Sequence, residues 1–166
     1  SMVWQYTPYL IPLFIAAAVS LALARYAWKR RPAAGATPLA IFMMAAAEWC
    51  IAYALELGGI GLETKVFWAK MQYFGIVTVA WMMLILMLEY AGYDKWLTST
   101  RTIFLGIIPF ITLYLVWTND THHLIWTSYQ LVPYGNFEIL DLGHGNGFWM
   151  IIAYSYPCLL IGMGVL

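Results

Sequence analysis

Apolar stretches of about membrane-spanning length alternate with short polar segments along this chain. A hydrocarbon layer of ~30 Å requires ~20 apolar residues in one helix. Five stretches approach this length, so we predict an all-α membrane protein with five transmembrane helices, formed by one domain over residues 1–166. The predicted helices are 4–24, 38–57, 65–90, 102–118 and 147–166.

Prolines lie within three of these predicted helices, at Pro12, Pro109 and Pro157. A proline inside a helix removes one backbone hydrogen bond and clashes with the preceding turn. We therefore expect bends in the first, fourth and fifth helices.

Composition supports the membrane assignment. Hydrophobic residues make up 63% of the chain, charged residues make up 10%, and the mean hydropathy is +0.75. Soluble domains contain ~25% charged residues. The eight basic and eight acidic residues cancel, so net charge gives no reason to expect nucleic acid as a partner. Cys50 and Cys158 both fall in apolar runs, which argues against a disulfide-stapled outer domain.

Basic residues are concentrated in alternate connections between the predicted helices. Cytoplasmic loops of membrane proteins are enriched in lysine and arginine, so these connections are predicted to be cytoplasmic and the amino terminus to be outside. Lys65 and Lys70 oppose this orientation, as two residues against six. The chain ends in the apolar "LLIGMGVL", and we expect it to be truncated after the fifth helix. The six supporting residues are Arg25, Lys29, Arg30, Arg31, Lys95 and Arg101.

The connection from Thr118 to Gly147 contains no basic residue and alternates in polarity. "IWTSYQLV" and "FEILDL" flank the turn sequence "PYGN". Alternation of aromatic and β-branched residues around a Pro/Gly turn predicts a β-hairpin. We therefore predict an extracytoplasmic hairpin between the fourth and fifth helices.

Several polar side chains fall within the predicted membrane helices. An ionised carboxylate such as Glu48 costs roughly 2.5 kcal/mol or more in the bilayer unless it is paired or protonated. Glu56 and Lys70 reach similar depths on an antiparallel helix pair, so we predict an ion pair that either fixes helix register or forms a ligand or proton site. Gln72 should point away from Lys70, and Glu89 should lie at the inner interface near Lys95 and Arg101.

The segment "TNDTHHLIW" carries the largest group of polar side chains outside the helices. His122, His123 and His144, together with nearby acidic residues, leave a zinc site open. Adjacent histidines seldom bind one ion, however, and no HExxH sequence is present. We favour a hydrogen-bonded turn in which Asn119 caps the helix end and His122 packs beside Trp126.

Four segments together resemble a known family: "YALELGGIGLETKVFWAKMQYFGI", "LEYAGYDKWLT", "VWTNDTHHLIWTS" and "HGNGFWMIIAYSYPCLL". In order and spacing they are similar to the amino-terminal seven-transmembrane sensor region of histidine kinases. By this resemblance the motif positions are Lys70, Gln72, Tyr73, Asn119, His122, Leu124, Trp126, His144, Gly145, Phe148, Trp149 and Tyr154.

The resemblance implies a sensory input domain of a two-component histidine kinase, in the plasma membrane of a bacterium or archaeon. It implies no catalytic activity for this chain, because the kinase domains are absent, and no cofactor. Expected partners are membrane lipid, an unknown small or lipid-like ligand, and a second copy in the full-length kinase. The candidate ligand or signal residues are Asn119, His122, Trp126, His144 and Trp149, with Glu48, Glu56, Lys70, Gln72 and Tyr73 inside the membrane.

Two other classes of function are kept as alternatives. An intramembrane metal-binding protein or enzyme would use the outer-loop histidines. A small transporter would use Glu48 as a proton carrier, although the sequence has no inverted repeat. No GxSxG, phosphate-loop or kinase signature occurs in the chain.

Overall fold

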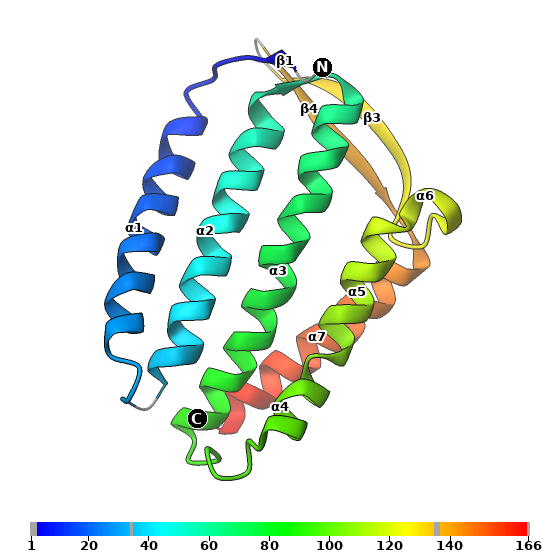
Figure 1. Ribbon diagram of the computed structural model, residues 1–166. Coiled ribbons are helices and arrows are strands. Elements are labelled where there is room, and N and C mark those ends of the chain that lie inside the picture. Colours follow the sequence, from blue (N-terminus) through cyan, green and yellow to red (C-terminus); the bar gives the residue numbers. More distant parts are fainter. Residues whose placement is uncertain (1–2, 34, 135–136, 166) are drawn as a thin grey trace.

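The computed structural model describes residues 3–33, 35–134 and 137–165. Three long antiparallel helices stand side by side (Figure 1). Each is long and apolar enough to cross a membrane. They are α1 (Leu10–Lys29), α2 (Ala36–Gly58) and α3 (Leu62–Tyr90).

The first helix begins later than the sequence predicted. Residues 3 and 4 form strand β1 (Val3–Trp4), which pairs antiparallel with β2 (Gly59–Ile60) over the α2–α3 turn. Thr7 precedes a proline and is disfavoured in helical conformation, so the helix starts only at Leu10. Pro12 therefore lies in the first turn of α1, where a missing N–H breaks no helical hydrogen bond. The predicted start at residue 4 was wrong, and Pro12 gives no reason for a bend.

The fourth predicted helix is bent, as its proline suggested. It consists of α4 (Ser99–Leu105) and α5 (Ile107–Trp117), which meet at an angle of 41°. Pro109 has no N–H to donate to the Leu105 carbonyl, so a continuous α-helix cannot form there. Instead, Gly106 N–H donates to the Ile103 carbonyl at 2.9 Å. The Thr102 carbonyl accepts from Trp81 Nε1 at 3.0 Å.

The predicted β-hairpin is present. After the short helix α6 (Asn119–His122), strands β3 (Trp126–Tyr134) and β4 (Phe137–His144) pair antiparallel, from Trp126 opposite His144 to Tyr134 opposite Phe137. The turn residues Gly135 and Asn136 lie outside the described residues. The chain then enters α7 (Asn146–Val165).

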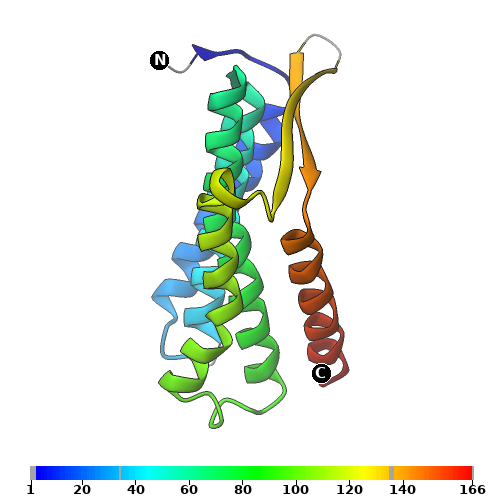
Figure 2. The ribbon, with the colours of Figure 1, turned by 90° about the vertical axis from the view of Figure 1, so that its right-hand side faces the viewer.

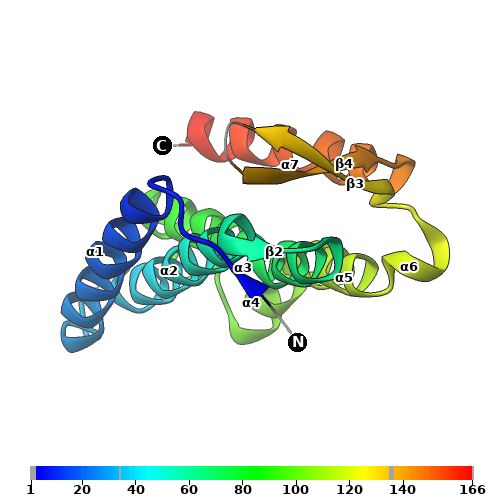
Figure 3. The same ribbon diagram turned by 90° about the horizontal axis from the view of Figure 1, so that it is seen from above.

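The helices and the hairpin form two layers. Viewed from above, α1, α2, α3 and α5 make one row, and the hairpin and α7 lie together on one side of it (Figure 3). The second side view shows the hairpin continuing into α7 along the helical row (Figure 2). We call the end of the molecule that carries the α2–α3 turn and the hairpin the hairpin end.

The predicted count of five spans is not confirmed. Within the described parts of the chain, three helices qualify as spans by length and composition, or four if the bent α4–α5 pair is one span. Helix α7 occupies the predicted fifth position, but the side chains of Tyr154, Pro157 and Cys158 lie outside the description, as does Leu166. The expected bend at Pro157 therefore stays a prediction.

Small residues form the contact between α2 and α3. A Cβ added at Gly75 of α3 would lie 2.5 Å from the Ala45 carbonyl oxygen and would also overlap the Glu48 carboxylate. Helices in a membrane approach this closely only where a side chain is missing. By helical spacing, the buried alanines Ala45 and Ala52 of α2 share the face of Glu48, whereas a different face carries Ala36, Ala40, Ala47 and Ala54.

Candidate functional site

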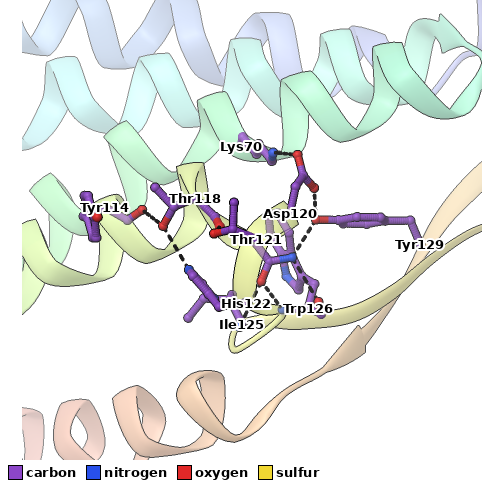
Figure 4. A network of polar contacts seen from close by, with 10 residues as sticks. Lys70, Tyr114, Thr118, Asp120, Thr121, His122, Ile125, Trp126 and Tyr129 are labelled. Atoms are coloured by element: carbon purple, nitrogen blue, oxygen red, sulfur yellow. Dashed lines mark hydrogen bonds and ion pairs between the residues drawn. The ribbon is translucent and has the colours of Figure 1, made fainter.

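Asn119 is the centre of a hydrogen-bond network at the hairpin end. Figure 4 labels its partners Ile125, Trp126 and Tyr129. The Asn119 side chain has no solvent exposure. Oδ1 accepts from the backbone N–H groups of Ile125 and Trp126, at 3.0 and 2.9 Å. Nδ2 donates to the Trp126 carbonyl at 2.9 Å and to the Tyr129 hydroxyl at 2.6 Å. One side chain thus fixes the start of β3 to the end of the fourth span.

An ion pair extends this network to α3. Lys70 Nζ donates to Asp120 Oδ2 at 2.9 Å, and the Tyr129 hydroxyl donates to Asp120 Oδ1 at 3.2 Å. The Lys70 side chain is 9% exposed and that of Asp120 is 65% exposed. The hydrogen bond from Lys70 lowers the pKa of the Asp120 carboxyl below its ordinary value. Burial raises the pKa of the Tyr129 hydroxyl, which favours its protonated donor form.

His122 contacts the end of α5 rather than α7. Its Nδ1 accepts from the Leu124 N–H at 3.1 Å, and Nε2 lies 2.9 Å from Thr118 Oγ1. The Thr118 hydroxyl in turn donates to the Tyr114 carbonyl at 2.8 Å. These bonds assign a neutral imidazole that carries its proton on Nε2 and donates to Thr118. The hydrogen-bonded turn that we expected is therefore present, and the packing of His122 beside Trp126 stays a prediction.

Trp126 is buried at the start of β3. It is 1% exposed, stands opposite His144 in the hairpin, and packs edge-on against Tyr73 and Tyr129, with ring centroids 5.5 and 5.9 Å away. Trp126, Ile125, Ala69 and Val116 form a buried apolar cluster. We call this cluster, with the Asn119 network around it, the joint, because α3, α5, the hairpin and α7 meet there.

Strand β4 passes into α7 directly beneath the joint. Gly145 N–H donates to the Ile125 carbonyl at 2.8 Å, and Phe148 N–H donates to the Leu124 carbonyl at 3.2 Å. A Cβ at Gly145 would lie 2.7 Å from the His123 carbonyl oxygen, so this crossing requires glycine. The His144 ring packs on Phe148 and Trp149, at 4.1 and 6.0 Å, whereas Trp149 itself is 58% exposed.

The predicted ion pair between Glu56 and Lys70 is wrong. Glu56 accepts a hydrogen bond from Gln72 Nε2, and Lys70 pairs with Asp120 on the far side of α3. Positions 70 and 72 are separated by about 200° around a helix, so only one of them can face α2. Lys65, seven residues before Gln72, shares its face and donates to the main-chain carbonyls of Glu56 and Leu57, at 2.9 and 3.2 Å.

Two further carboxylates of the long helices, those of Glu48 and Glu89, lie near glycines. Glu48 lies against Gly75 at the close approach of α2 and α3. Glu89 lies beside Gly35, at the start of α2. Within the described residues the only salt bridge is Lys70–Asp120, so Glu89 does not pair with Lys95 or Arg101. Arg101 stacks over the Trp96 ring instead.

Two adjoining cavities lie beside the joint. The one nearer the hairpin end has a volume of about 570 Å³ and contains the polar side chains Glu56, Gln72 and His144 in its wall. The rest of the wall is formed by Trp49, Tyr53, Tyr73, Trp126, Leu13, Cys50, Ala69, Ile76 and Leu142. The second, of about 470 Å³, is lined mainly by apolar side chains of α3, α5 and α7. Trp49, Tyr73 and Ile76 line both. We call them the polar cavity and the apolar cavity.

The histidines offer no assembled metal site in the described part of the chain. No group of three or more histidine, cysteine, aspartate or glutamate side chains lies close enough there to hold one ion. Both ring nitrogens of His122 are already engaged, and His144 packs on aromatic rings.

Sequence analysis missed three contacts: Lys70–Asp120, Gln72–Glu56 and Asn119–Tyr129. The seven-residue spacing of Lys65 and Gln72 was the available signal for the second, because it places both on one face of α3. Nothing in the sequence identified Tyr129 as a partner of Asn119.

These features define a multi-pass helical membrane protein with a hairpin packed on its side. Residues 12–166 match the family described as the N-terminal 7TM region of histidine kinase, and the chain belongs to that family. It is therefore a membrane sensory input region and not a catalytic kinase domain. Comparisons with curated proteins and with solved structures gave no match.

Proposed function

We propose that the hairpin end receives an extracytoplasmic or membrane-borne stimulus and that α7 passes the resulting movement to the cytoplasmic domains of a two-component histidine kinase. The observation that carries this proposal is the position of the polar cavity. Its wall includes Trp126 and His144, which pair with each other in the hairpin. Trp126 begins β3 and packs in the joint, and His144 ends β4 just before α7.

A ligand in this cavity would act on two elements at once. Tyr73 belongs to α3, within the tightly packed helical row, whereas Trp126 and His144 belong to the hairpin. A molecule that fits better between them in one arrangement would stabilise that arrangement, because only differential affinity shifts a conformational equilibrium. Gly145 then carries the shift directly into α7.

The proposed signal residues have separate roles. Asn119 and Trp126 hold the hairpin on the helices, and Tyr73 and His144 line the cavity. His122 fixes the turn that precedes β3. In the full-length kinase we propose a homodimer in the plasma membrane of a bacterium or archaeon.

The test uses the full-length kinase in lipid nanodiscs. Trp126→Ala and His122→Ala should each remove the dependence of autophosphorylation on the stimulus, with the larger loss for Trp126→Ala, while membrane insertion is unchanged. Gln130→Ala is the matched control, because Gln130 lies on the same strand but is exposed. Parental responses in both variants would show that the joint is structural packing only.

The orientation is tested separately in intact cells. Tags after Lys29 and near Asp94 should be protected from impermeant reagents, and a tag at Gly135 should be labelled. This follows from the basic residues of the first and third connections. Labelling after Lys29 would reverse the proposed orientation.

A further inference from the structure

The polar cavity combines one carboxylate with several aromatic rings. Trp49, Tyr53, Tyr73 and Trp126 contribute to its wall, and Glu56 is the acidic residue among the lining side chains. Aromatic faces attract cations through the quadrupole of the ring, and organic ammonium groups are the ligands most often bound in this way. The lining therefore has the chemistry of a site for an organic cation.

The charge of Glu56 is not neutralised by a salt bridge in the described residues. Its hydrogen bond comes from the neutral amide of Gln72. Lys65 acts on the carboxylate electrostatically, but its ammonium donates its hydrogen bonds to the main-chain carbonyls at the end of α2. A carboxylate among apolar helices is costly without a cation or a proton, and a bound cation would remove this cost.

The second cavity suggests what is attached to the cation. It adjoins the first through Trp49, Tyr73 and Ile76, and its other lining residues are almost all apolar. The polar residue Thr112 in that lining already donates to the Ile108 carbonyl at 2.8 Å. A single molecule with a polar head and an apolar chain would satisfy both cavities.

We propose that the polar cavity binds the ammonium head group of a cationic amphiphile, whose alkyl chain occupies the apolar cavity. Binding requires only the geometry above, whereas a role of this molecule as the stimulus rests on the proposed sensory function. The head group would lie between Glu56 and the aromatic rings, and the chain would run between α3 and α7.

The test compares two probes of equal chain length on the purified chain in maltoside micelles, by native mass spectrometry. Dodecyltrimethylammonium should bind about tenfold more tightly than dodecanol, because only the first can use the carboxylate and the rings. Glu56→Gln keeps the size of the side chain and should abolish this preference. Glu63 is an exposed acid in the first turn of α3, at the hairpin end. Glu63→Gln should therefore retain the preference for the cationic probe.

Folding of each variant is checked by its thermal unfolding. If Glu56→Gln does not fold, Tyr53→Leu takes its place and should lower the cation preference about threefold without changing the carboxylate. Equal binding of both probes to the parent, or an unchanged preference in the folded variants, would overturn the proposal.

Lipid competitors identify the source of the cation. Displacement of the probe by phosphatidylethanolamine but not by phosphatidylglycerol would indicate a membrane lipid, and displacement by neither would indicate a free amphiphile. Equal displacement by both would contradict recognition of the ammonium group. If the cation preference is found but full-length kinase activity does not respond to the probe, the site stands and its role as the sensor of this ligand fails.

Discussion

The α2–α3 contact and the joint hold the molecule together in opposite ways. Between α2 and α3, the missing side chain of Gly75 allows the backbones to approach closely at Ala45. At the joint, the elements are held by directional hydrogen bonds around Asn119 and by one ion pair, with cavities on either side of Tyr73.

This difference separates a scaffold from an element that can be shifted. Close packing tolerates almost no displacement, because dispersion contacts are lost over a fraction of an ångström. A few hydrogen bonds beside a cavity can be exchanged for contacts with a ligand. The contrast predicts that removing a hydrogen-bonding group destabilises the attachment of the hairpin. Enlarging a small side chain should instead destabilise the helical row.

The largest effect is expected for Asn119→Ala. It removes the partners of two backbone N–H groups and one carbonyl, and each buried group left unpaired costs about 1–3 kcal/mol. We expect a loss of at least about 3 kcal/mol in stability, measured by thermal unfolding followed by near-ultraviolet circular dichroism. Gln130→Ala should change little. A loss below about 1 kcal/mol would show that water or other groups replace Asn119.

Gly75→Ala should destabilise the helical row by about 1–3 kcal/mol, because the new methyl group overlaps the Ala45 carbonyl and the Glu48 carboxylate. Thr78→Ala, on the same helix, should have little effect. Adding Glu48→Ala to Gly75→Ala should recover part of the loss, since one of the two overlaps is then relieved. Unfolding of the purified variants measures each step, and a neutral Gly75→Ala would contradict the close approach.

Substitutions of the adjacent residues His122 and His123 should have different effects on stability. His122→Phe removes the bonds to Thr118 and Leu124 and should cost about 1 kcal/mol. His123 has a φ of 51°, in the left-handed region that glycine adopts without strain. His123→Gly should therefore leave the stability unchanged or slightly raised. Equal losses of stability in the two variants would contradict both the hydrogen bonds of His122 and the left-handed backbone conformation of His123.

The smallest effect is expected for the ion pair between Lys70 and Asp120. Because the Asp120 side chain is mostly exposed, a double-mutant cycle with Lys70→Met and Asp120→Asn should give about 0.5 kcal/mol at neutral pH. The folded pKa of Asp120 is lowered, so this contribution is present above the ordinary carboxyl pKa and is lost as pH falls through the lowered value. In a double-mutant cycle of Glu56 and Lys70, the two stability changes should add. A coupling energy between them would support the Glu56–Lys70 ion pair, which is absent from the structure.

The sequence was a good guide to elements with a repeating pattern. Apolar runs located α2, α3 and α7 to within a few residues, and alternation around "PYGN" located the hairpin. The start of α1 was misplaced because Trp4 is apolar and was counted into the helix, although it lies in strand β1. Hydropathy alone does not distinguish the two, and the partner at residues 59 and 60 lies far along the chain.

The site was harder to predict because its contacts join distant segments. Lys70 could be assigned to the third helix, but its partner depended on which face of α3 meets α2. The prediction that Asn119 caps the helix end was wrong, because its side chain bonds to residues of the hairpin strand β3 and to Ile125 just before it. Its burial and its bonds to β3 follow from the packing of the hairpin on α3 and α5, which no local pattern contains.

The hydrogen bond from Trp81 to the Thr102 carbonyl restricts how the bent fourth span can move. In hydrocarbon no water is present to replace a lost donor, so sliding α3 along its axis would leave that carbonyl without Trp81. The Trp81 ring also fills the space above Gly106. Axial translation between these helices is therefore costly, whereas tilting of α5 about the break at Gly106 keeps the bond. Relative motion of α3 and the bent fourth span is thereby directed into tilting rather than axial sliding.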